Sequence, residues 1–517
     1  MTGCPEKPVN RIQLLPPCRA PQCPVLAAAT LAPADWAVIA LYLAGIIALG
    51  LWLGRGQRTT RDYFLGGRDL PWWSVAFSII ATETSAVTFI AVPAAAYGGN
   101  LGFIQAVIGF AIARIVLAVW LVPYYFKGEI YSPYEMVGRA CGQSARRTVA
   151  GLFLVAGALA AGVRVYVICI PLELMLPVSI GAAIWLFVGL SLVYTYAGGI
   201  RAVVWTDAVQ FILLIGGGIF VFFHLAGQHP GGLSTAFGEL NAKGKLDWLN
   251  TDFTLGGSLT IWMGIFGATF LTLSTHGADQ LIVQRVLACR TQADGRRALV
   301  LSALLILPLI LLFLLIGALL FYHHDIMKIP LGMPAPEVQP GMKQNDYLLP
   351  IYLVTALPPI VKGVLIVALL AAAMSSVSSA LSAMASVFTM DIRQRAGDEA
   401  NALRDSKRAT LAAALVLIGI GHLCQGAASA LTLAFKLSSL TSGALLGALA
   451  WSLWQKKSPP PPIIAGMLVS LVLMSAIAYG VPGEQFAWPW YTLTGTIITL
   501  ITTKLVTPAY SRKTTPL

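Results

Sequence analysis

Long apolar runs separated by short polar connections are the feature of this sequence that most limits its fold. We count about thirteen runs of close to 20 apolar residues, the length that a helix needs to cross the hydrocarbon core of a bilayer. The chain is 57% hydrophobic and only 11% charged, which excludes an ordinary soluble domain. Short alternating strands of a membrane barrel are not seen. We therefore predict an all-α integral membrane protein, with runs at approximately 32–54, 73–97, 101–126, 148–173, 177–197, 202–226, 257–284, 297–322, 352–388, 408–425, 427–454, 461–481 and 487–507.

The net charge of +12 does not indicate a nucleic-acid partner, because the basic residues lie in short connections between apolar runs. Lys and Arg gather in alternate connections, as expected for loops that stay in the cytoplasm. This pattern predicts a protein of the inner (plasma) membrane with its N-terminus outside and its C-terminus in the cytoplasm. The predicted inner connections lie at 55–68, 127–147, 201, 290–297, 393–408, 456–457 and 512–513.

Three parts of the chain are expected. Residues 1–31 are rich in Pro and Cys and predict a disordered N-terminal extension, without a convincing cleavable signal peptide. Residues 32–507 form a single transmembrane domain, and residues 508–517 form a short cytoplasmic tail. The bilayer is the expected surrounding, and the sequence shows no sign of an obligate protein partner.

A cluster of four serines interrupts the apolar run at 352–388. On a helix, Ser375, Ser378 and Ser379 share one face, and Ser376 lies one turn after Ala372, whose carbonyl can approach its hydroxyl. Two interpretations remain open from the residues alone. The neutral oxygens suit a hard monovalent cation, but small residues and serines also let transmembrane helices pack closely.

A few ionisable residues stand inside apolar runs, where each is costly enough to be a functional candidate. They are Glu83, Arg164, Glu173, Asp207, His276 and Asp279, of which Glu173 could lie near the outer interface. Structural alternatives exist for most of them. Asp207 could pair with Arg201, and Glu83, Arg164 and Asp279 could neutralise one another.

Two polar interruptions break otherwise apolar helices five crossings apart, at Ala81–Thr88 and Ser274–Gln280. Broken helices at corresponding positions of two halves are typical of transporters built from inverted repeats, with the binding site at the membrane midplane. The two repeats would cover approximately 73–226 and 257–454. We expect a small-molecule solute as the ligand. No HExxH or GxSxG motif indicates an enzyme.

Four segments resemble the sodium/solute symporter family, whose members include sodium-coupled sugar, sialic acid and organic acid transporters. They are Asp62–Trp73, Tyr196–Gln210, Asp279–Arg285 and Ser375–Asp391. The resemblance implies a LeuT-like fold of two inverted five-helix repeats, preceded by one helix and followed by two, and a sodium-coupled symporter. A membrane sensor or channel on the same scaffold is the alternative from another class.

The resemblance also implies two sodium ions. Carried over by position, the first ion would be bound by the carbonyls of Ala81, Thr84 and Ala372 and the hydroxyls of Ser375 and Ser376. The second would be bound by Asp207, Ser375, Ser378 and Ser379.

The predicted solute is a small organic acid, with a sugar or polyol as the alternative. Arg164 supplies a fixed cation that matches a carboxylate bidentately, while carboxylates in the broken helices can also accept hydrogen bonds from sugar hydroxyls. The predicted pocket is lined by Glu83, Ser85, Thr88, Phe103, Gln105, Arg164, His276 and Asp279.

Overall fold

The computed structural model describes residues 31–511, except residues 85, 230, 258, 335, 340–341, 395–398, 426–427 and 456. Nearly all of the predicted extension over 1–31 and most of the predicted tail over 508–517 lie outside these residues, as does Ser85. Within the described part, the regular elements are helices, and the one β contact is an isolated bridge between Leu70 and Cys289.

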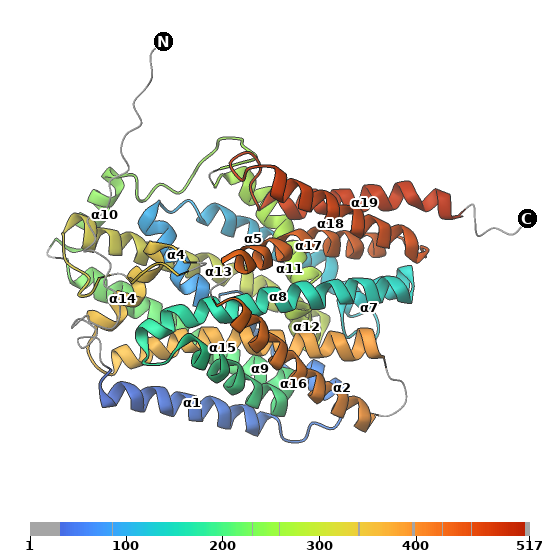
Figure 1. Ribbon diagram of the computed structural model, residues 1–517, viewed down its shortest axis with the longest axis horizontal. Coiled ribbons are helices and arrows are strands. Elements are labelled where there is room, and N and C mark those ends of the chain that lie inside the picture. The colour runs from blue at the N-terminus through green and yellow to red at the C-terminus, as the bar shows by residue number, and fades with distance from the viewer. Residues whose placement is uncertain are drawn as a thin grey trace, which may run out of the picture.

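The described residues form nineteen α-helices, whose arrangement is shown in Figure 1. The first half contains α1 (Pro33–Leu53), α2 (Thr60–Leu65), α3 (Trp72–Glu83), α4 (Ala86–Gly98), α5 (Ile104–Val116), α6 (Val122–Tyr125), α7 (Pro133–Cys141), α8 (Gln143–Met175), α9 (Ile180–Gly227) and α10 (Gly232–Ala242). The second contains α11 (Thr269–Gly277), α12 (Gln280–Leu287), α13 (Gln292–Phe321), α14 (Leu348–Thr355), α15 (Val361–Val387), α16 (Glu399–Leu423), α17 (Ala428–Trp454), α18 (Pro460–Gly480) and α19 (Trp490–Ser511).

Eight helical segments of the described chain are long and apolar enough to cross a membrane. A ninth candidate is the pair formed by α3 and the residues Thr88–Gly98 of α4, which meet at a bend of 59°. These segments confirm the prediction of a multi-pass helical membrane protein. The predicted number of thirteen crossings stays a prediction.

Helix α9 is too long for one crossing and contains two of the predicted runs. Its 48 residues would measure about 72 Å at 1.5 Å per residue, more than twice the hydrocarbon thickness of about 30 Å. The helix is interrupted at Gly199, where φ is 51° and ψ is −151°. A side chain here would also collide with the backbone carbonyl of Tyr63, so glycine is required at this bend.

Helix α15, which carries the serine cluster, lies at the centre of the molecule. It packs against α1, α3, α8, α9, α12 and α16, and all its residues from Leu365 to Val387 are buried (Figure 1). The run predicted at 352–388 is divided, because two prolines separate α14 from α15. Asp35 of α1 then caps α15, since its Oδ1 accepts the N–H groups of Ile360 at 2.7 Å and Gly363 at 2.9 Å.

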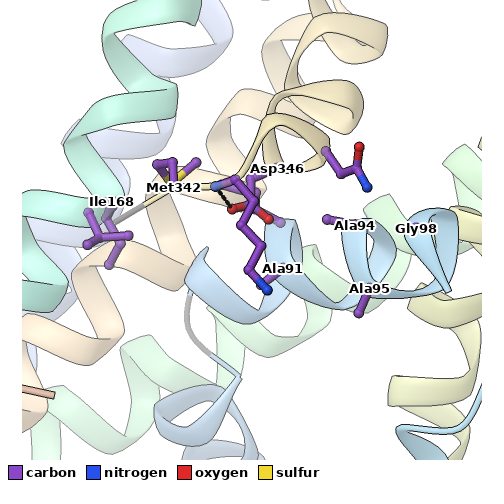
Figure 2. Close-up of a pocket in the computed structure, with 11 residues that line it drawn as sticks. Ala91, Ala94, Ala95, Gly98, Ile168, Met342 and Asp346 are labelled. Atoms are coloured by element: carbon purple, nitrogen blue, oxygen red, sulfur yellow. Dashed lines mark hydrogen bonds between the residues drawn. The ribbon is translucent and has the colours of Figure 1, made fainter. Parts of the chain in front are cut away.

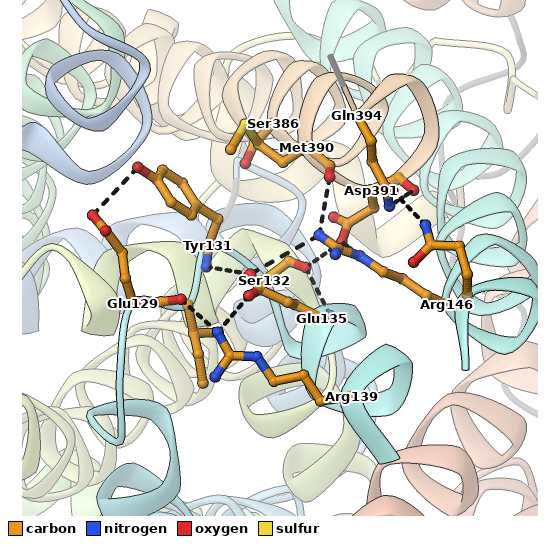
Figure 3. Close-up of polar contacts among 12 residues, drawn as sticks. Glu129, Tyr131, Ser132, Glu135, Arg139, Arg146, Ser386, Met390, Asp391 and Gln394 are labelled. Atoms are coloured by element: carbon orange, nitrogen blue, oxygen red, sulfur yellow. Dashed lines mark hydrogen bonds and ion pairs between the residues drawn. The ribbon is translucent and has the colours of Figure 1, made fainter. Parts of the chain in front are cut away.

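The connections predicted to face the cytoplasm gather at one end of the molecule. Figure 1 places α2 and α7 at this end and α10 and α14 at the opposite end. Ion pairs join the connections to one another: Arg290 to Asp69 at 2.7 Å, and Arg146 to Asp391 at 2.8 Å. Figure 3 shows Arg146 and Asp391 within a wider polar network that includes Ser132. The grouping fits the predicted topology, and the side that faces the cytoplasm stays a prediction.

Candidate ion and solute site

The break between α3 and α4 leaves backbone oxygens without a helical partner. The N–H of Thr84 donates to the carbonyl of Ile80 at 2.7 Å and ends the hydrogen bonding of α3. Carbonyls in the last turn of a helix receive no hydrogen bond from an N–H group of that helix. The helix dipole also makes this end attractive to cations. The hydroxyl of Thr84 is also buried and has no hydrogen-bond partner among the described residues.

Helix α15 presents the serine hydroxyls toward the same region. Ser376 donates its hydroxyl to the carbonyl of Ala372 at 3.3 Å, which leaves lone pairs of its oxygen available. The Ser375 hydroxyl is buried without a hydrogen-bond partner in the described chain. Helix α3 packs directly on α15, where the Thr82 and Ser379 hydroxyls lie 3.2 Å apart. The predicted ligands of the first ion lie on or next to these packed helices, and all five are buried: Ala81, Thr84, Ala372, Ser375 and Ser376.

The predicted second ion site contains an arginine that the sequence interpretation did not include. Asp207 Oδ2 accepts Arg285 Nη2 at 2.9 Å and the Ser78 hydroxyl at 2.6 Å. Arg285 also donates to Ser78 through Nε at 2.7 Å and to the hydroxyl of Ser379. Both members of the ion pair are fully buried. The alternative pairing of Asp207 with Arg201 is wrong, because Arg201 is exposed and the partner is Arg285.

One half of this second site keeps free oxygens. Within the described residues, Asp207 Oδ1 and the Ser375 hydroxyl make no hydrogen bond of normal geometry, and the two side chains lie near each other. Ser378 and Ser379 donate to the carbonyl of Ser375 at 3.1 and 2.6 Å. Arg285 therefore takes one carboxylate oxygen and Ser379, while the other carboxylate oxygen and Ser375 remain available to a cation.

A cavity of about 280 Å³ lies beside the break in α3 and α4. Five of the eight predicted pocket residues line it: Glu83, Thr88, Arg164, His276 and Asp279. They come from four different parts of the chain, namely the break, α8, α11 and the N-terminal cap of α12. The two polar interruptions recognised in the sequence thus face one cavity.

Arg164 is a cation of this cavity, and the Asp279 carboxylate on the same cavity interacts with it electrostatically. Its guanidinium makes no hydrogen bond or ion pair with any residue that the structure describes. Asp279, on the same cavity, uses Oδ1 to accept the N–H of Leu281 at 2.8 Å and so caps α12. Arginine has five donors in a fixed planar arrangement that fits a carboxylate. The cavity therefore offers an anionic group a permanently charged guanidinium whose N–H donors are unused, close to the Asp279 carboxylate.

Glu83 is neutralised by Arg114 and not by Arg164. The Arg114 guanidinium is buried, forms a short ion pair with Glu83 and lies 3.3 Å from His276 Nε2. His276 Nε2 is in turn 3.7 Å from Glu83. Of the predicted mutual neutralisation of Glu83, Arg164 and Asp279, the part that involves Glu83 is therefore wrong. The part that joins Arg164 to Asp279 agrees with their electrostatic interaction.

Comparison with known proteins agrees with these features. The family model described as the sodium:solute symporter family matches residues 63–454. The chain belongs to this family. It is accordingly a membrane-embedded, sodium-coupled transporter of an organic solute and not an enzyme, as the resemblance implied.

Two curated members of the family extend over most of the chain. The sodium/sialic acid symporter SiaT of Proteus mirabilis is 27% identical over 495 residues, covering 92% of this chain and 95% of the relative. The sodium/glucose cotransporter of Vibrio parahaemolyticus is 29% identical, covering 84% and 83% respectively.

Solved structures confirm the LeuT-like fold. A substrate-bound, outward-open sodium-coupled sialic acid symporter superimposes with a TM-score of 0.81 at 25% identity, covering 92% of this chain and 98% of the other. A nucleobase–cation symporter, at 16% identity and a TM-score of 0.50, shares the fold alone.

Two predicted pocket residues of the symporter lie elsewhere. Gln105 does not line the cavity, since its amide holds the connection before α11: Oε1 accepts the N–H of Asn250 at 2.8 Å, and Nε2 donates to the carbonyl of Leu259 at 3.3 Å. Phe103 caps the start of α5, and its ring contacts that of Phe110, with centroids 6.4 Å apart. Ser85 lies outside the described residues.

Arg114 and Arg285 were not named as functional candidates from the sequence, although one of the two could have been recognised from its position. Arg114 stands inside the apolar run predicted at 101–126, so the cost of a membrane charge should have placed it beside Glu83 and Arg164. Arg285 lies in the motif Asp279–Arg285, but no local pattern shows that its partner is 78 residues earlier in the chain.

Proposed function

We propose that this symporter imports a small hydroxylated carboxylic acid, such as a sialic acid, together with two sodium ions. The observation that carries the proposal is the guanidinium of Arg164, whose N–H donors make no hydrogen bond with any described residue, in a cavity next to the broken helix. A carboxylate bound there would satisfy its donors, while Glu83, Thr88 and Asp279 would accept hydrogen bonds from solute hydroxyls. The sialic acid symporter of Proteus mirabilis supports this solute class.

The first sodium ion would bind where the α3 break meets α15, using the carbonyls of Ala81, Thr84 and Ala372 and the hydroxyls of Ser375 and Ser376. Five or six oxygen ligands suit a hard cation. The buried Thr84 and Ser375 hydroxyls without partners support such a ligand set. An ion there would hold the broken helix against α15 and so complete the solute cavity.

The second sodium ion would share Asp207 with Arg285. The ion would use Asp207 Oδ1 and Ser375, with Ser378 and Ser379 nearby, while Oδ2 stays paired with Arg285. A second sodium ion helps to drive the uptake of an anion. Each positive charge that crosses a potential of about 100 mV releases about 2.3 kcal/mol, so two sodium ions release about 4.6 kcal/mol. Moving a monovalent anion inward against the same potential costs about 2.3 kcal/mol of this free energy.

Transport would follow alternating access, in which one repeat moves against the other around a fixed midplane site. Sodium orders the break at Ala81–Thr84, and solute then favours closure on the outer side. Low cytoplasmic sodium releases the ions and afterwards the solute. The protein would lie in the inner (plasma) membrane with its N-terminus outside.

A thermal-unfolding screen tests the solute class. We expect sialic acid to raise the melting temperature of the purified symporter in sodium chloride but not in choline chloride, because a ligand that binds only the folded state stabilises it. Glucose and inositol are the matched neutral probes. These probes test the alternative of a sugar or polyol solute, whose hydroxyl groups could donate hydrogen bonds to the carboxylates of Glu83 and Asp279. A sodium-dependent shift with glucose and none with sialic acid would reject the carboxylate assignment.

A further inference from the structure

A second, larger cavity lies beside the solute cavity, toward the end of the molecule that is predicted to face outside. Its volume is about 580 Å³, and it is bounded by α4, α8 and the segment before α14 (Figure 2). Ala91, Ala94 and Ala95 of α4 form one wall with small side chains, and Ile168 of α8 forms another. We call this space the outer vestibule.

The outer vestibule continues the helix faces that line the solute cavity. On α4, Thr88 of the cavity is followed three and seven residues later by Ala91 and Ala95 of the vestibule. On α8, Arg164 is followed four residues later by Ile168. Residues at these spacings share a helix face, and four residues advance about 6 Å. The two spaces are therefore successive levels between the same two helices.

The polar groups of the outer vestibule come from one short segment, Lys343–Asp346. Lys343 is exposed and forms no ion pair within the described chain. The Asp346 carboxylate is buried, and its Oδ2 accepts the backbone N–H of Lys343 at 2.6 Å. Asn345 adds an amide. The vestibule thus presents an exposed ammonium that interacts electrostatically with the buried Asp346 carboxylate but is not ion-paired to it. The carboxylate accepts hydrogen bonds, and the Asn345 amide can accept or donate them.

We propose that the outer vestibule is a second, transient binding site for the hydroxylated carboxylate solute, in which Lys343 binds the carboxylate before it reaches Arg164. This inference rests on the proposed function. The ammonium attracts the anion into a concave space, which raises its local concentration at the entrance. Asn345 and Asp346 bind hydroxyl groups. Once the solute moves inward by one or two helical turns, the permanently charged Arg164 replaces Lys343 as its partner.

Uptake of radiolabelled sialic acid into proteoliposomes tests the vestibule. We expect Lys343→Gln to lower kcat/KM by about 3- to 10-fold with little change in kcat, because electrostatic attraction acts on capture. The loss should shrink when choline chloride raises ionic strength at constant sodium, since salt screens exposed charges. Lys343→Arg should restore capture. Lys328→Gln is the matched control, because Lys328 is an exposed cation of the preceding connection that does not line the vestibule.

The outcomes separate this inference from the function on which it rests. An unchanged kcat/KM in Lys343→Gln, or an equal loss in Lys328→Gln, overturns the vestibule site while sodium-dependent uptake still stands. A wild-type protein without sodium-dependent uptake of sialic acid overturns the solute assignment and the vestibule together.

Discussion

Replacing Arg285 with glutamine is expected to destabilise the symporter by about 3–5 kcal/mol in sodium-free buffer, the usual effect of removing one partner of a buried ion pair. The reason is that Asp207 would remain as a buried carboxylate without a counter-charge. Sodium should then stabilise this variant more than the wild type, because the ion would supply the missing positive charge. Asp207→Asn should be destabilising too, but its sodium dependence should be weaker than that of the wild type.

Thermal unfolding across a sodium series, with choline keeping ionic strength constant, measures both effects. The double variant Asp207→Asn/Arg285→Gln should lose less than the sum of the single losses, since the pair acts as a unit. Arg290→Gln is the control, because its pair with Asp69 is exposed and worth at most about 1 kcal/mol. If Arg285→Gln gained no extra stabilisation from sodium, Asp207 would be a structural ion-pair partner and not an ion ligand.

Replacing Arg164 with glutamine is expected to raise the KM for sialic acid by about 30- to 4000-fold, since losing a charged partner in a desolvated site costs roughly 2–5 kcal/mol. Arg164→Lys should recover only part of this loss, because an ammonium keeps the charge but not the bidentate geometry. The measurement is sodium-driven uptake as a function of sialic acid concentration.

The matched comparison for this arginine is Arg114→Gln. That change removes a guanidinium from the same region but leaves Glu83 without its partner. It should therefore weaken sialic acid uptake through repulsion and should be partly rescued by the second change Glu83→Gln. The change Glu83→Gln should not rescue Arg164→Gln, because Glu83 is paired with Arg114. If Arg164→Lys kept the affinity and the solute preference of the wild type, the carboxylate assignment would be lost.

The fold could be predicted from the sequence because it depends on local patterns. Apolar runs of membrane length, the basic connections between them and the polar breaks at Ala81–Thr88 and Ser274–Gln280 can be recognised within short windows. These features predicted a helical transporter and the meeting of both breaks at one cavity. The predicted division of α9 also holds, because Gly199 marks the bend.

Charge pairing within the site could not be read in the same way. Asp207 meets Arg285, and Glu83 meets Arg114, only because helices distant in sequence pack together. A sequence shows that each charge needs a partner but not which partner it finds. Gln105 illustrates the converse error. This polar residue near the start of α5 bonds the backbone of a connection and does not line the solute cavity.

Uptake of sialic acid into proteoliposomes, with and without an inward sodium gradient, tests the central claim most directly. We predict accumulation only with the gradient, a sodium Hill coefficient near two, and faster uptake at an inside-negative potential, because two sodium ions and one carboxylate carry one net positive charge. Ser376→Ala should abolish coupling at the first ion site, and Asp207→Ala should lower the Hill coefficient toward one. Sialic acid uptake that is equal with and without the sodium gradient would contradict the account.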